Sequence, residues 1–258
     1  MSVRAHPRFL RRRATVREHR ARRHLRRALW VLTIVAAGWA LAWVAQSPLF
    51  SVASIEVVGA RHAAVSEILE ANRVYEGRPL VLIRSGSVAD ALAADPWVKD
   101  ASVHRRFPDQ IEVRLIERQE VIAVPGADGW RTVSDDGRIM QAVAAAPDQL
   151  ATVSRDVAVA GSIGEQVTDR LAGVVEFAAA IPVDLRGPLS VGMAGEELVA
   201  YINGHRVRLG DPSNMAAKAA ALVAVLEDPR LGEGRLIDLI APSRPAVKPA
   251  PAPVSPQA

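Results

Sequence analysis

The sequence predicts an α+β protein that a single N-terminal helix holds in a membrane. Three observations lead to this fold class. Residues 28–47 form an apolar run without a charge, residues 50–122 show strand and helix patterns in the order β-α-α-β-β, and residues 123–241 are rich in short strands with two helices. Each pattern has the period of the element it predicts, so the chain divides into an anchor and two folded domains.

The apolar run over residues 28–47 predicts a transmembrane helix. As a helix it spans roughly 30 Å, the thickness of a bilayer's hydrocarbon core. Trp30 and Trp43 lie near its ends, where indole rings favour the membrane interface. A buried core helix would not run this long without a polar face. Cleavage as a signal peptide at Ala40-Leu41-Ala42 stays open, although the apolar run continues past that match.

The charge of the chain is divided at the apolar run. Residues 1–27 hold eleven arginines and one glutamate, a net charge of +10, whereas the whole chain is +4, so residues 28–258 carry −6. Such a tail could bind nucleic acid, but it has no interleaved aromatic residues and no DNA-binding module. The positive-inside rule instead predicts a basic cytoplasmic tail over 1–27, with the rest of the chain outside the cell.

The order β-α-α-β-β is read from local patterns in residues 50–122. Alternating apolar residues predict the last two strands, and the turn Phe107-Pro108-Asp109-Gln110 separates them. Ser66 and Ser87 are expected to cap the two helices. The predicted elements are a strand over 50–58, helices over 66–72 and from 87 to Pro96, and strands over 98–106 and 110–121.

The second domain, predicted over residues 123–241, contains one strong hairpin signal. Asn203-Gly204 supplies the two positive φ angles of a type I′ turn between alternating segments. Asp211 is expected to cap a helix with Pro212 at its first position. The other predictions are a hairpin turn over 135–138, a helix over 165–181, a last strand over 234–241 and a disordered Pro/Ala-rich tail over 242–258.

Three segments of the first domain resemble a known family. They are residues 50–59, residues 97–108 beginning Trp97-Val98-Lys99, and residues 111–118 beginning Ile111-Glu112-Val113. They are similar to a POTRA (polypeptide-transport-associated) domain and, with the membrane span, to the bacterial cell-division family FtsQ/DivIB. Gln119-Glu120-Val121 lacks a proline that usually follows in the family, so the resemblance does not define where the strand ends.

No catalytic or metal-binding motif is found in the sequence. His62, His104 and His205 are isolated, and no spacing of metal ligands, no phosphate loop and no nucleophile motif is present. The absence of cysteine excludes disulfides and thiol chemistry. We therefore expect no enzyme, cofactor or metal. The alternatives are a membrane-tethered cell-wall enzyme, which would need a cleft of convergent acids, and a POTRA transport component, which would normally repeat the domain.

The last predicted strand is the candidate binding site. Its apolar residues are followed at once by proline, as expected for a sheet edge that accepts a strand from another protein. Alternatively, the strand closes the core and the tail covers its edge. The family resemblance implies a non-catalytic divisome scaffold at the septum that binds FtsB and FtsL, with FtsW and FtsI as further partners. The residues implied are Leu236, Ile237, Asp238, Leu239, Ile240 and Pro242, with Lys218 and Leu222 on the preceding helix.

Overall fold

The computed structural model describes residues 26–44 and 47–249, and its first element is a long exposed helix. The helix runs over Arg26–Val44, has a mean hydropathy of 1.6 and buries none of that surface inside the protein. This helix is long and apolar enough to cross a membrane, as the sequence predicts. Most of the predicted basic tail, residues 1–25, lies outside the described residues.

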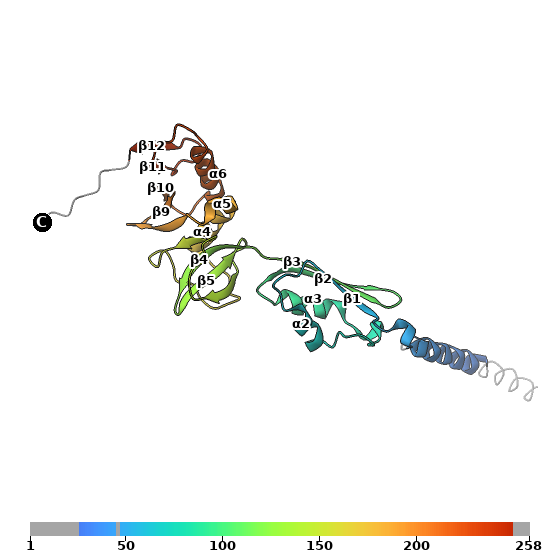
Figure 1. Ribbon diagram of the computed structural model, residues 1–258. Helices are drawn as coiled ribbons and strands as arrows, with labels where there is room; N and C mark the ends of the chain where they lie inside the picture. The colour runs from blue at the N-terminus through green and yellow to red at the C-terminus, as the bar shows by residue number, and fades with distance from the viewer. Residues whose placement is uncertain (1–25, 45–46, 250–258) are drawn as a thin grey trace, which may run out of the picture.

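The first domain has the predicted β-α-α-β-β order. Within the described residues its three strands form one sheet in the order β1-β3-β2, with β1 parallel and β2 antiparallel to β3. The two α-helices cover one face of this sheet (Figure 1). The elements are η1 (Pro48–Phe50), β1 (Ser54–Val58), α2 (Val65–Ala71), η2 (Leu80–Leu82), α3 (Ser85–Ala93), β2 (Val98–Arg106) and β3 (Gln110–Glu117).

Alternating residues of β3 build the core of the first domain. Ile111, Val113 and Leu115 point to the helices and are buried, and Leu69 of α2 and Leu92 of α3 pack against them. The predicted turn over 107–110 joins β2 to β3. Because apolar residues alternate in the strand and recur every three or four positions in the helices, this arrangement could be predicted from the sequence.

Three details of the first domain differ from the sequence prediction. Ser66 and Ser87 do not cap helices, because α2 begins at Val65 and α3 at Ser85. The strand predicted over 110–121 is two strands, β3 and β4 (Glu120–Gly126). The break falls at Arg118, whose side chain turns into the junction between the domains.

The second domain is built on one large sheet. Among the described residues nine strands lie in the order β12-β11-β10-β9-β8-β7-β4-β5-β6, and α4 and α6 pack against each other beside the sheet (Figure 1). The remaining elements are β5 (Gly129–Ser134), β6 (Ile139–Val143), β7 (Ala151–Val153), α4 (Asp169–Ala180), α5 (Val183–Arg186), β8 (Ser190–Ala194), β9 (Glu197–Ile202), β10 (His205–Gly210), α6 (Met215–Leu226), β11 (Arg235–Asp238) and β12 (Ala246–Pro249).

The Asn203-Gly204 hairpin is confirmed, whereas both helix starts in this domain were predicted too early. Asn203 and Gly204 both have positive φ, as the type I′ turn requires. Helix α4 begins at Asp169 rather than near residue 165. Helix α6 begins after Asn214, because the carboxylate of Asp211 instead accepts hydrogen bonds from Ser213 and Lys218.

The disorder predicted from Pro242 onward is wrong for residues 246–249. These residues form β12, which pairs antiparallel with β11. The predicted last strand is also shorter than expected, because β11 ends at Asp238. Residues 250–258 lie outside the described part of the chain.

Candidate partner-binding site

The C-terminal end of the large sheet is formed by β10, β11 and β12. Strand β11 pairs parallel with β10, with Val207 opposite Ile237, and antiparallel with β12, with Ile237 opposite Val247. Within the described residues β12 is the outermost strand at this end. The edge that can accept another strand therefore belongs to β12 rather than to β11.

This pairing corrects the prediction that residues 236–241 present the edge. The backbone of β11 is paired on both sides, so a strand could add there only after β12 had left. The alternative drawn from the sequence, in which the tail covers the strand, describes the structure better. Its physical basis is a short turn after Leu239, closed by a hydrogen bond from Arg244 N to Ala241 O (3.0 Å), which brings the tail back along β11.

Several of the predicted site residues lie in the core. Ile237, Leu239 and Leu222 have no exposed surface. Lys218 is 1% exposed, and its Nζ donates to the carbonyl oxygen of Asp211 (2.8 Å) and to its Oδ1 (3.1 Å). The expectation that Lys218 and Leu222 form a contact surface is thus not supported by their positions, since neither side chain reaches solvent.

The other predicted residues are accessible. Leu236, Asp238 and Pro242 are partly buried, and Ile240 is 46% exposed. Leu236 and Asp238 lie on the solvent face of β11, because alternate residues of a strand point to opposite faces and Ile237 points to the core. Leu236 and Asp238 therefore share one face of β11, and Ile240 and Pro242 lie in the turn between β11 and β12.

A ladder of charges crosses the solvent face of β9, β10 and β11. The guanidinium of Arg208 binds Glu197 (Nη2–Oε2, 2.8 Å) on one side and Asp238 (Nη1–Oδ2, 3.0 Å) on the other. The hydrogen bonds to Glu197 and the negative charge of Asp238 raise the pKa of Arg208. Asp238 also accepts a hydrogen bond from Ile240 N (3.2 Å), so the same carboxylate fixes the start of the turn toward β12.

The role of His205 could not be predicted from the sequence. It appeared isolated, but its buried ring accepts a hydrogen bond at Nδ1 from the backbone N–H of Arg235 (3.1 Å). This bond positions the first residue of β11 beside β10. Since the two residues are far apart along the chain, no local pattern indicates it.

Strand β12 is the element of the site that sequence reasoning missed. All four of its residues are exposed, and Val247 is 45% exposed. A faint signal was present: Val247 is β-branched, Lys248 is a residue that natural edge strands use, and Pro249 is tolerated only at sheet edges or bulges. The proline content of the tail concealed this signal.

The opposite edge of the sheet, at β6, is partly covered. Ile139 donates its N–H to Glu165 O (2.9 Å), and its carbonyl oxygen accepts from Gly164 N (2.8 Å). A bridge between Arg138 and Gln166 extends this cover by one residue. The loop before α4 therefore occupies the start of the β6 edge, whereas nothing in the described residues pairs with the outer side of β12.

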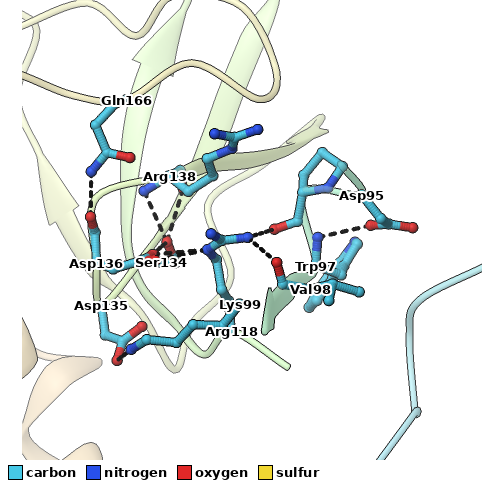
Figure 2. A network of polar contacts seen from close by, with 11 residues as sticks. Asp95, Trp97, Val98, Lys99, Arg118, Ser134, Asp135, Asp136, Arg138 and Gln166 are labelled. Carbon is cyan, nitrogen blue, oxygen red and sulfur yellow. Dashed lines mark hydrogen bonds and ion pairs between the residues drawn. The ribbon is translucent and has the colours of Figure 1, made fainter. Parts of the chain in front are cut away.

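A polar network joins the two domains and fixes the end of β3 against the β5–β6 turn (Figure 2). Arg118 donates from Nε to both carboxylate oxygens of Asp136 (3.0 and 2.9 Å) and from Nη1 to the carbonyl oxygens of Pro96 (3.1 Å) and Val98. Burial acts to raise the pKa of Asp136, but the hydrogen bonds from Ser134 and Arg118 outweigh it and leave the pKa lowered.

Next to this network, Glu117 ties the loop after β1 to the end of β3. Its Oε1 accepts hydrogen bonds from the backbone N–H groups of Arg61 (2.6 Å), His62 (2.8 Å) and Ala63 (3.0 Å). Burial acts to raise the pKa of Glu117, but these bonds outweigh it and lower the pKa to about 2. The ring of His62 also stacks on Trp97, with 4.6 Å between centroids.

The described residues, 26–44 and 47–249, contain no group of three or more side chains that could hold a metal ion. At this end of the large sheet, the feature that can bind another protein is the unpaired backbone edge of β12. Strand pairing between proteins is the interaction that such an edge supports.

Comparisons with known proteins agree with the POTRA fold of the first domain and with the family resemblance seen in the sequence. The family model "POTRA domain, FtsQ-type" matches residues 50–118. The chain is 26% identical over 221 residues to the cell division protein FtsQ of Corynebacterium glutamicum, covering 84% of this chain and 95% of the relative. It is 28% identical over 202 residues to FtsQ of Mycobacterium leprae, covering 78% of this chain and 57% of that relative.

Two further proteins match a smaller part of this chain. FtsQ of Anaeromyxobacter sp. is 33% identical over 104 residues, which are 40% of this chain and 34% of that protein. The solved extracytoplasmic domain of DivIB from Geobacillus stearothermophilus is 15% identical, covering 45% of this chain and 98% of the other, with a TM-score of 0.32.

The apolar helix, the first domain and these comparisons define a membrane-anchored protein with an FtsQ-type POTRA domain. Residues 50–118 thus form an FtsQ-type POTRA domain, and over most of its length the chain is similar to bacterial cell division proteins of the FtsQ/DivIB family.

Proposed function

We propose that this protein is a non-catalytic scaffold that binds the small membrane proteins FtsB and FtsL by strand addition at the outer edge of β12, and through them reaches FtsW and FtsI. Its N-terminus lies in the cytoplasm, both folded domains lie outside, and the protein gathers at the septum. The free edge of β12 beside a fully paired β11 is the observation that carries this proposal.

The backbone of β12 supports the strand-addition step. Alternate residues of an edge strand direct their N–H and C=O groups away from the sheet, so a partner strand can form hydrogen bonds without any rearrangement of β11. Pro249 has no N–H, so it limits how far toward the C-terminus a ladder on β12 can run. The free edge is thus short, and the partner's side chains must supply part of the affinity.

The core residues next to β12 offer an apolar contact for the side chains of a partner strand. A row of core residues crosses four neighbouring strands in register, from Ala200 and Val207 to Ile237 and Val247. The first three are fully buried, whereas Val247 is 45% exposed, since among the described residues β12 is the last strand at this end of the sheet. An apolar residue of an added strand would cover Val247 and extend the core by one position.

Because the protein is anchored in the membrane, a weak contact at the short β12 edge is sufficient for binding. Partners that share the bilayer with the helix Arg26–Val44 are held at a high effective concentration, so a weak contact can be well occupied. Net charges of +10 over residues 1–27 and −6 over residues 28–258 support the orientation with the tail in the cytoplasm. Alkaline phosphatase fused after Ala258 should be active in cells, whereas inactivity would contradict this orientation.

Val247→Asp tests the proposed edge in the full chain. Capture of FtsB and FtsL from membranes that contain the variant should fall about tenfold, because a carboxylate would replace the apolar contact. Val159→Asp is the matched control, since Val159 is 53% exposed and lies on the loop before α4 rather than at β12. Equal capture by the two variants would contradict a site at β12.

A truncated chain distinguishes addition to β12 from its displacement. A chain that ends at Arg244 lacks β12 but retains the turn after β11. If partners add to β12, this chain should lose them. Unchanged or stronger capture would overturn the proposed edge and show that partners pair with β11 in place of β12.

A further inference from the structure

We propose that the end of the POTRA domain nearest the membrane helix docks on the lipid surface. In this arrangement Phe107 and Val81 enter the interfacial layer, and Arg84 and Arg105 bind the phosphate groups of anionic phospholipids. We call this end of the domain, formed by residues 49–50, 81–84 and 105–107, the membrane-proximal tip. The domain would then rest on the bilayer with a fixed orientation.

Large apolar side chains are exposed at the membrane-proximal tip. Phe107 at the β2–β3 turn is 67% exposed, Val81 and Leu82 in η2 are 51% and 53% exposed, and Leu49 before β1 is 76% exposed. These residues come from three separate segments of the domain, yet they gather at one end of it. An exposed apolar patch of this kind is typical of a surface that contacts a membrane or another apolar phase.

The tip lies at the depth of the last turns of the membrane helix. A groove of about 290 Å³ is lined by Leu41 and Val44 of the helix and by Val81, Arg105 and Phe107 of the domain. Figure 1 shows the β2–β3 turn at the end of the domain that faces this helix. Since Trp43 marks the interface end of the helix, side chains that share a groove with Leu41 lie within the headgroup region.

The length of the connection independently keeps the tip close to the bilayer. Six residue steps separate Val44, the end of the helix, from Phe50, which lines the groove. A fully extended chain of this length spans about 20 Å, and the helical turn η1 within it shortens the reach. The base of the domain therefore cannot lie far from the headgroups.

The charges around the tip are mostly positive, although residues 28–258 carry a net −6. Arg84 and Arg105 are exposed, and neither forms an ion pair with another described residue. Arg106 is bound to Glu112 (2.6 Å) and contributes less. The charged residues of segments 75–84 and 104–110 are Arg78, Arg84, Arg105 and Arg106 against Glu76 and Asp109. A basic rim around exposed apolar residues matches an anionic bilayer surface.

The absence of cysteine allows a direct test on the full chain in vesicles. One spin label is placed at Phe107→Cys, a second at Val81→Cys, and a control at Ile116→Cys. Ile116 is 58% exposed but lies at the opposite end of β3. In vesicles containing phosphatidylglycerol, the labels at 107 and 81 should collide more with oxygen than with a water-soluble nickel complex, and the label at 116 should show the reverse. Equal nickel access at all three positions would overturn the proposal.

The contribution of the arginines is tested with charge reversal. Arg84→Glu combined with Arg105→Glu should move the label at 107 toward water in phosphatidylglycerol vesicles, with a smaller shift in phosphatidylcholine alone. Arg61→Glu is the control, because Arg61 lies beside Glu117 at the far end of the domain. An unchanged label in the double variant would refute binding of anionic headgroups by these arginines.

Discussion

Arg118 and Asp136 form the ion pair that links the POTRA domain to the second domain, with 2.9 Å between Nε and Oδ2. The side chain of Arg118 is 11% exposed and that of Asp136 is 30% exposed, so the pair is largely withdrawn from solvent. Two backbone carbonyl groups of the POTRA domain accept further bonds from the same guanidinium. This single side chain therefore holds the segments that meet where the chain passes from one domain to the other.

Arg118→Ala should lower the free energy of unfolding by about 2 kcal/mol, because it leaves a carboxylate and two carbonyl groups without their partner. Urea denaturation of the purified protein measures the change. Lys99→Ala is the control, since its pair with Asp135 (2.9 Å) is exposed on both sides and should contribute less than about 1 kcal/mol. Equal losses in the two variants would show that the buried pair has no special role.

Glu117 should make stability depend on pH in the acidic range. Its pKa falls from an ordinary value of 4.5 to about 2 in the folded protein, so its contribution is complete above pH 4.5 and is lost as the pH falls toward 2. Glu117→Gln should cost on the order of 2 kcal/mol at pH 7. The difference from the original protein should shrink between pH 4.5 and 2 in urea denaturation. A difference that does not change with pH would contradict this account.

The variant Lys218→Ala distinguishes a structural role of this side chain from a direct contact with binding partners. Because its ammonium group is buried and satisfied only by Asp211, Lys218→Ala should destabilise the second domain by about 3 kcal/mol. Capture of FtsB and FtsL per folded molecule should remain unchanged, since the side chain does not reach the surface. A loss of capture with unchanged stability would restore Lys218 as a contact residue.

The sequence was most informative where a pattern is local. The β2–β3 turn, the Asn203-Gly204 hairpin and the alternating core of β3 depend on residues close together in the chain, so their periodicity and turn chemistry are visible without the fold. The membrane helix is similarly local, since its length and composition alone define it.

The elements that could not be predicted depend on contacts between distant segments. Strand β12 forms because β11 offers an unpaired edge, and its own composition resembles a disordered tail. The break at Arg118 depends on Asp136 in another domain. The family resemblance implied Lys218 as a contact residue, but its ammonium group binds Asp211 within the core.

The position of β12 sets a length requirement for any partner anchored in the same bilayer. The POTRA domain stands between the membrane helix and the second domain, and β12 lies at the far end of the molecule (Figure 1). The nine residues of β2 alone extend about 30 Å. A partner must therefore rise at least that far before it reaches the edge, which takes a helix of about 20 residues. If partners bind at β12 as proposed, membrane proteins with shorter extracytoplasmic segments cannot reach this strand.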